Sequence, residues 1–100
     1  MAQQQIEKRQ PNVYGIVGEL SFESVPSIER EGFKSIDESD EHLEFDFSEV
    51  TLCSSASLAL ILSWMRFATK QGKSLIFKGF PPQLAGQIRS AQLKDIIPSK

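Results

Sequence analysis

The chain has 100 residues, of which 40% are hydrophobic and 24% charged, and its 11 basic and 13 acidic residues give a formal net charge of -2. This length allows one domain, spanning residues 1–100, with a single core that needs no disulfide or metal. The composition excludes wholesale disorder. The charge excludes the strongly basic surface with which proteins bind nucleic acid or anionic lipid.

Cysteine use and the shortness of the apolar segments predict a cytoplasmic protein. Cys53 is the only cysteine, so it forms no internal disulfide and no cysteine-based zinc site, which fits a reducing compartment. Residues 1–10 lack the apolar stretch of a signal peptide. The longest apolar run, residues 58–62, is far shorter than the ~20 residues that span a bilayer.

Two short strands and a helix are predicted in the first 40 residues. The strands cover residues 4–8 and 13–17, and the Pro11-Asn12 pair between them favours a turn. Ser24, two residues before a proline, signals a helix start. The following apolar or small residues at helical spacing form one face: Val25, Ile28, Gly32 and Ile36. The acidic stretch 37–41 is expected in a solvated loop.

The second half of the chain alternates between strands and helices. Residues 43–47 alternate apolar and polar side chains, which predicts a strand covered on one face, followed by a loop over 48–54. Next come a helix over 55–71 closed by Gly72, a buried strand over 74–78, a helix over 83–92 packed through Leu84, Ile88 and Ala91, and a short element at 96–98. The order ββαβαβα predicts an α/β fold: a mixed central sheet of about four strands with helices mainly on one face.

No catalytic, metal or cofactor site is predicted. Residues 72–74, Gly-Lys-Ser, imitate the end of a phosphate-binding loop, but Phe67 stands where that motif requires glycine. His42 is the only histidine and has acidic neighbours, which predicts a surface position. Glu44 and Asp46 share one strand face and are expected as solvated charge. We therefore expect a protein that is not an enzyme.

The most informative stretch is residues 52–57, Leu-Cys-Ser-Ser-Ala-Ser, which places three hydroxyls and a thiol in the turn that opens the longest helix. A helix start presents unpaired backbone N–H groups and partial positive charge, so it favours a capping oxygen, an anion or a phosphorylated hydroxyl. Two interpretations stay open: Ser54 or Ser55 is a simple N-cap, or the turn is a contact site.

The same helix has a wider apolar surface than one sheet face requires. The predicted core stripe consists of Leu58, Ile61, Leu62, Met65 and Ala68. An adjoining arc contains Leu60, Trp64 and Phe67. Either neighbouring helices cover this arc, or part of it docks a partner protein.

These features resemble the STAS domain, the fold of anti-sigma factor antagonists. A strand ending in Asp-apolar-Ser-x-Val, residues 46–50, precedes the serine-rich turn and the apolar residues 58–62. Residues 18–20, Gly-Glu-Leu, and 70–73, Lys-Gln-Gly-Lys, are also similar to that family. The resemblance covers residues 13–98, after an N-terminal strand and turn over residues 1–12. The chain length and the Ile-Ile-Pro end are similar to the small cytoplasmic STAS subunits of Mla-type phospholipid ABC transporters.

In the family, this turn carries an Asp, a Ser or Thr that is phosphorylated in sigma-regulating members, a small residue and a Gly. The resemblance places Ser55 at the phosphorylated position, with Ser54 replacing the Asp, Ala56 at the small position and Ser57 replacing the Gly. Loss of the Asp argues against kinase-dependent switching. The turn still carries a hydroxyl at the helix start. Together with the apolar arc, the predicted partner-binding residues are Ser54, Ser55, Ala56, Ser57, Leu60 and Trp64.

The resemblance implies a non-enzymatic subunit without cofactors. It would bind and support the ATPase of an ABC transporter that moves phospholipid between the inner and outer membranes, and would reach the inner membrane only through that complex. The alternative is an anti-sigma factor antagonist that binds a kinase-like anti-sigma factor and is switched by phosphorylation of Ser55. The identity of the partner distinguishes these two functions.

Overall fold

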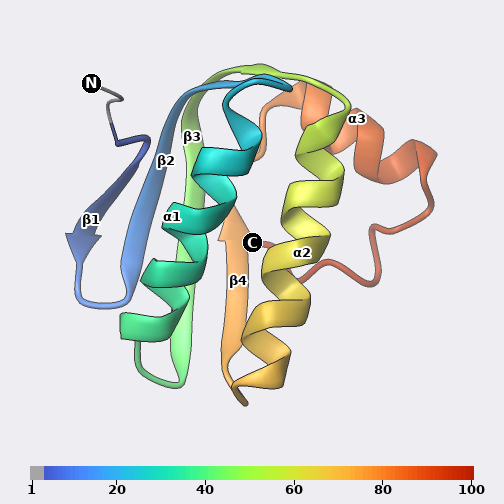
Figure 1. The fold of residues 1–100 in the computed structure, drawn as a ribbon. Helices are drawn as coiled ribbons and strands as arrows, with labels where there is room; N and C mark the ends of the chain where they lie inside the picture. Colours follow the sequence, from blue (N-terminus) through green and yellow to red (C-terminus); the bar gives the residue numbers. More distant parts are fainter. Residues whose placement is uncertain (1–3) are drawn as a thin grey trace.

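Four strands form one sheet in the order β1-β2-β3-β4, and helices cover one of its faces (Figure 1). The computed structural model describes residues 4–100. The elements in chain order are β1 (Ile6–Gln10), β2 (Val13–Leu20), α1 (Val25–Glu38), β3 (His42–Cys53), α2 (Ala56–Lys70), β4 (Ser74–Lys78) and α3 (Pro82–Ser90). The predicted order ββαβαβα and the mixed sheet of four strands are confirmed.

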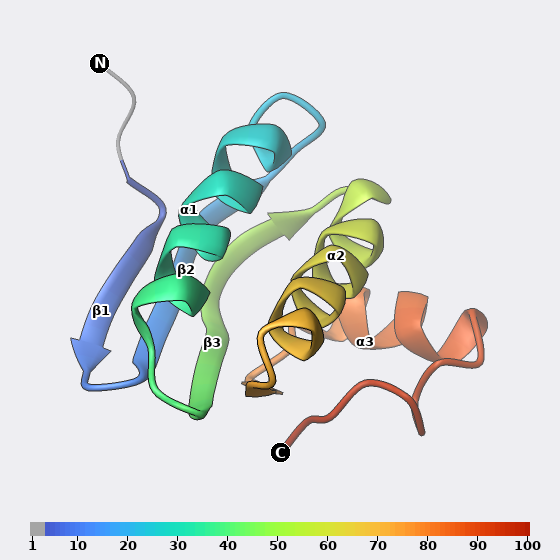
Figure 2. The same ribbon diagram turned by 60° about the horizontal axis from the view of Figure 1, so that its bottom comes forward.

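The strands lie side by side in the order of the sequence. β1 and β2 form an antiparallel hairpin, and its turn contains Asn12 with a φ of 67°, a conformation that asparagine tolerates well. β2, β3 and β4 are parallel, and α1 and α2 make the two connections. Figure 2 shows α1 and α2 above the sheet and α3 beyond α2. Because the strands are parallel, the ends of β2 and β3 and the starts of α1 and α2 share one end of the molecule, which we name the carboxyl end of the sheet.

The alternation of residues 43–47 determines which face of the sheet is buried. Leu43, Phe45 and Phe47 lie on the helix side and are at most 4% exposed. Phe45 packs edge to face against Trp64 of α2, with the ring centroids 4.9 Å apart. Full burial of a side chain of this size stabilises the fold by roughly 1.5–3 kcal/mol. The hydrophobic core therefore lies between the sheet and the helices.

The opposite face of the sheet carries paired charges. Glu44 of β3 accepts a hydrogen bond from Lys100 Nζ at 2.5 Å and lies 3.5 Å from Lys78 Nζ. The bond from Lys100 lowers the pKa of Glu44, although partial burial acts in the other direction. Arg9 of β1 reaches across β2 and pairs with Glu49 of β3. Because polar and charged side chains occupy this face, it needs no second layer of helices.

Several element boundaries differ from the sequence prediction, including those of β1, which covers Ile6–Gln10 instead of residues 4–8. Residues 48–53, predicted as a loop, continue β3, because β2 runs on to Leu20 and pairs with Cys53 after two register shifts. Residues 37 and 38, predicted in a loop, form the end of α1. α3 ends at Ser90, so Ala91 is exposed instead of packing in the core. Gly72 follows α2 with a φ of 69°, as predicted for a left-handed cap.

After α3 the chain returns to the sheet beside β4. Phe77 N donates to Pro98 O at 2.9 Å, and Lys100 N donates to Phe77 O at 3.0 Å. Ile97 is 3% exposed and anchors the segment in the core. The short element predicted at residues 96–98 is thus a turn followed by a parallel bridge between Ser99 and Phe77.

Candidate functional site

The serine-rich turn connects β3 to α2 at the carboxyl end of the sheet (Figure 1). Ser54 N donates to Leu20 O at 2.8 Å, which extends the contact between β2 and β3 by one bond. Ser54 O accepts a bond from Ser57 N at 3.1 Å and one from the side-chain amide of Gln87 in α3 at 3.3 Å. The sheet, α2 and α3 all hold the turn, and together they fix the position of Ser55.

Ser54, and not Ser55, provides the side-chain cap of α2. Its Oγ accepts a hydrogen bond from Ala56 N at 3.2 Å. Ser55 occupies the N-cap position but makes no capping bond with its side chain, and it is exposed. Ser54 therefore caps α2, a helix of 15 residues, and the exposed Ser55 leaves its hydroxyl accessible at the helix start.

Ser57 lies inside the protein. It is 0% exposed, and its Oγ has no hydrogen-bond partner within residues 4–100. The Cys53 thiol is its neighbour, and burial raises the pKa of Cys53. Ala56 is half-buried. A partner that approaches the turn meets Ser54, Ser55 and Ala56, whereas Ser57 is covered by the fold itself.

Leu60 and Trp64 belong to the core, which corrects the expectation that they dock a partner. Both are at most 1% exposed. The indole N–H of Trp64 donates to Glu29 O of α1 at 3.1 Å. At the edge of the same arc, Phe67 stacks on Phe33 of α1 with ring centroids 4.4 Å apart. α1 therefore covers the apolar arc of α2.

Two exposed apolar side chains at the carboxyl end of the sheet were not identified from the sequence. Phe22, in the loop before α1, is 69% exposed, and Leu52, near the end of β3, is 49% exposed. Leu52 pairs with Glu19 in the sheet register, so it lies beside the end of β2. Ser24 Oγ donates to Glu19 O, which ties the loop that contains Phe22 to the same strand end. In the sequence each is a single apolar residue beside serine, threonine or glutamate, and this context does not predict an exposed contact residue. We name these exposed and half-buried residues at the carboxyl end of the sheet the serine-turn surface: Phe22, Leu52, Ser54, Ser55 and Ala56.

Within residues 4–100, no group of three or more His, Cys, Asp or Glu side chains is placed to hold a metal ion. No helix in that part of the chain has both the length and the apolar character needed to cross a membrane. His42 is exposed and begins β3, so it lies at the opposite end of the strand from Ser55. The five residues of the serine-turn surface carry hydroxyl or apolar side chains and no charge, and Phe22 is of the aromatic type that is enriched at protein interfaces.

The family to which the chain belongs follows from a comparison with models of protein families. A family model described as "Mlab, STAS domain" matches residues 4–98. The chain belongs to the STAS domain family. STAS domains are generally non-catalytic modules that bind and regulate other proteins. No curated protein sequence matches the chain.

Solved structures share the STAS fold with this domain. An anti-sigma factor antagonist from Mycobacterium paratuberculosis has a TM-score of 0.78 and 19% identity, covering 94% of this chain and 80% of that one. The unphosphorylated anti-sigma factor antagonist SpoIIAA has a TM-score of 0.73 and 18% identity, covering 96% and 86%. The STAS domain of a SulP transporter from Vibrio cholerae has a TM-score of 0.62 and 18% identity, covering 85% and 66%. These similarities establish a common fold.

Proposed function

We propose that this STAS domain is a non-enzymatic cytoplasmic subunit that binds and supports the ATPase of an ABC transporter moving phospholipid between the inner and outer membranes. The observation that carries the proposal is the exposed Ser55 hydroxyl at a fixed helix start, at the same end as the exposed Phe22 and Leu52. The family description supports the choice of a transporter subunit. The protein would reach the inner membrane only through the complex.

The serine-turn surface has the physical properties of a protein contact. A partner that covers Phe22 and Leu52 removes apolar area from water, which favours association. The turn is already held by backbone bonds to Leu20 and within α2, so little ordering is needed on binding. Because Ser54 supplies the cap, the Ser55 hydroxyl is available to the partner.

A second candidate is an anti-sigma factor antagonist that binds a kinase-like anti-sigma factor and is switched by phosphorylation of Ser55. The two solved antagonists with the same fold favour this candidate. A phosphate on Ser55 would stand at the positive end of α2, which tolerates it, whereas a covering partner would have to desolvate it. Ser54 replaces the Asp that the resemblance places before the switched residue, and this favours the transporter subunit.

Capture of the partner from the native cell separates the two candidates. The full chain carries an affinity tag and serves as bait, and bound proteins are identified by mass spectrometry. We expect an ABC transporter ATPase. Recovery of a kinase-like anti-sigma factor would overturn the transporter assignment in favour of the second candidate, and a folded bait that recovers neither would overturn both.

Substitutions at Ser55 test the surface itself. Ser55→Glu is expected to abolish capture, because the interface must desolvate the new charge, whereas Ser55→Ala retains at least part of it. Thr69→Glu is the matched control on α2, about 21 Å farther along the helix at ~1.5 Å per residue, and should capture the partner normally. Equal, undiminished capture by both Ser55 variants would show that the contact lies elsewhere.

A further inference from the structure

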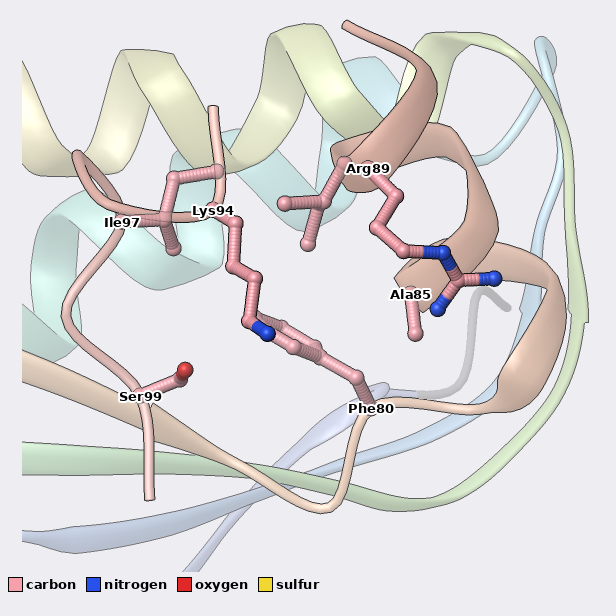
Figure 3. Close-up of a pocket in the computed structure, with 7 residues that line it drawn as sticks. Phe80, Ala85, Arg89, Lys94, Ile97 and Ser99 are labelled. Atoms are coloured by element: carbon pink, nitrogen blue, oxygen red, sulfur yellow. The ribbon is translucent and has the colours of Figure 1, made fainter. Parts of the chain in front are cut away.

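A pocket of about 150 Å³ lies between α3, the loop after β4 and the segment that returns to the sheet (Figure 3). Its lining consists of Phe80, Ala85, Ile88, Arg89, Lys94, Ile97 and Ser99. None of these residues belongs to the serine-turn surface. An apolar cavity of about this volume admits benzene in another protein, so the space suits an organic group the size of one ring.

The walls of the pocket are held by the core and by backbone bonds. The Phe80 ring stacks on the buried Phe77, with centroids 5.7 Å apart. On the other side, Leu93 N donates to Ile88 O at 3.0 Å, which ties the returning segment to α3. Phe77 N donates to Pro98 O at 2.9 Å, which ties the same segment to β4. A pocket whose walls are fixed on three sides needs little ordering when a ligand enters.

Both charged side chains that line the pocket are basic. Lys94 extends toward Phe80, and Arg89 extends past Ala85 at the rim (Figure 3). Neither basic group forms an ion pair with a carboxylate in the described part of the chain, and the neighbouring Asp95 does not line the pocket. The pocket therefore combines an apolar floor with uncompensated positive charge.

The charge of this pocket differs from that of a second cavity, located between β1 and α1. That cavity is lined by Lys8 and Lys34 but also by Glu31 and Glu38, so its positive and negative side chains offset one another. Only the first of these two cavities joins an apolar surface to charge of a single sign.

We infer that the pocket beside α3 binds a small organic acid: one carboxylate or phosphate group on an apolar body about the size of a single ring. The body contacts Phe80, Ile88 and Ile97, while the anion lies within reach of Lys94 and the Ser99 hydroxyl. Charge-assisted hydrogen bonds and apolar contact act together on such a ligand. A neutral ring loses the first contribution, and a bare anion loses the second.

Titration of the full chain, followed by backbone amide NMR, tests this inference with simple probes. Benzoate or phenyl phosphate is expected to shift the amide signals of Phe80, Ala85 and Ile97 to saturation. Benzamide keeps the ring without the charge, and acetate keeps the charge without the ring, so both should bind at least tenfold more weakly. Equal binding of benzoate and benzamide, shifts confined to other regions, or no saturable binding of either aromatic acid would overturn the proposal.

Two variants and a control locate the binding. Lys94 is exposed, so Lys94→Gln should leave the melting temperature unchanged. The same variant should bind the aromatic acid about tenfold more weakly. Ala85→Leu should block the pocket. Lys34→Gln removes an exposed positive charge elsewhere and should bind as the unchanged chain does. If Ala85→Leu fails to fold, Lys94→Gln still tests the inference. Undiminished affinity of the Lys94→Gln protein for the aromatic acid overturns it.

Discussion

The indole of Trp64 in α2 lies so close to Gly32 in α1 that a Cβ on residue 32 would stand 2.1 Å from the indole Nε1. The same N–H donates to Glu29 O of α1 at 3.1 Å. The missing side chain at Gly32 lets the two helices approach, and Trp64 fills the space between α1 and the sheet. The apolar width of α2 therefore reflects two buried contacts, one with the sheet and one with α1.

Gly32→Ala is expected to destabilise the fold by about 1–3 kcal/mol, because the added methyl group overpacks the contact with Trp64. Urea unfolding gives the free energy. Gly86→Ala in α3 is the control, since a Cβ there meets nothing closer than 4.0 Å, and it should stabilise by up to about 1 kcal/mol. Trp64→Ala should cost about 3–5 kcal/mol. A fully stable Gly32→Ala protein would contradict the close contact.

Replacement of the two serines by alanine should separate their roles. Ser54→Ala removes the side-chain cap of α2 and should cost about 0.5–2 kcal/mol of unfolding free energy. Ser55→Ala removes an exposed hydroxyl without a capping bond and should change stability by less than about 0.5 kcal/mol. Thermal unfolding of both variants measures the difference. The reverse order would assign the cap to Ser55.

Ser57→Ala is expected to leave stability unchanged or raise it by up to about 1 kcal/mol, because the buried hydroxyl lacks a hydrogen-bond partner in the described residues. Ser39 is the matched control, since it is also buried but its Oγ donates to Ser35 O at 2.6 Å. Ser39→Ala should lose about 1 kcal/mol. A comparable loss for Ser57→Ala in urea unfolding would show that its hydroxyl is bonded.

Glu44→Gln should reduce stability near pH 7 by about 0.5–1 kcal/mol, because it breaks the pairing with Lys100 and Lys78. The pKa of Glu44 is lowered in the folded state, so its contribution is complete above the ordinary carboxyl pKa of about 4.3. It is lost as the pH falls through the lowered value. The stability difference between the two proteins, measured by urea unfolding from pH 7 to pH 3, should shrink toward zero. A difference independent of pH would exclude this charge pairing.

The order of elements was predictable because it rests on local patterns. The alternation of residues 43–47 predicts a strand, and the position of Gly72 predicts a helix end, without reference to distant parts of the chain. The end of β3 was not predictable, since residues 48–53 become a strand only through their pairing with β2. A strand of this kind is specified by its partner, because the strict alternation of buried and exposed residues that predicts a strand stops after Phe47.

Which face of α2 is buried could also not be predicted from the sequence. Leu58, Leu62 and Met65, expected in the core, are half-buried, whereas Leu60 and Trp64 are fully buried. A helix that is apolar around much of its circumference has no unique inward face, so its neighbours decide its rotation. At the site, the resemblance identified Ser55, but the exposure of Phe22 and Leu52 depends on where the loop and the strand end lie in space.

The pairing of residues 98–100 with Phe77 has a consequence for behaviour at high concentration. An unpaired strand edge offers its N–H and C=O groups to strands of other molecules, which promotes aggregation. Here the returning segment occupies that edge at Phe77. A chain shortened after Ile97 would keep its core anchor but expose the β4 edge, so it should remain folded while self-associating more readily.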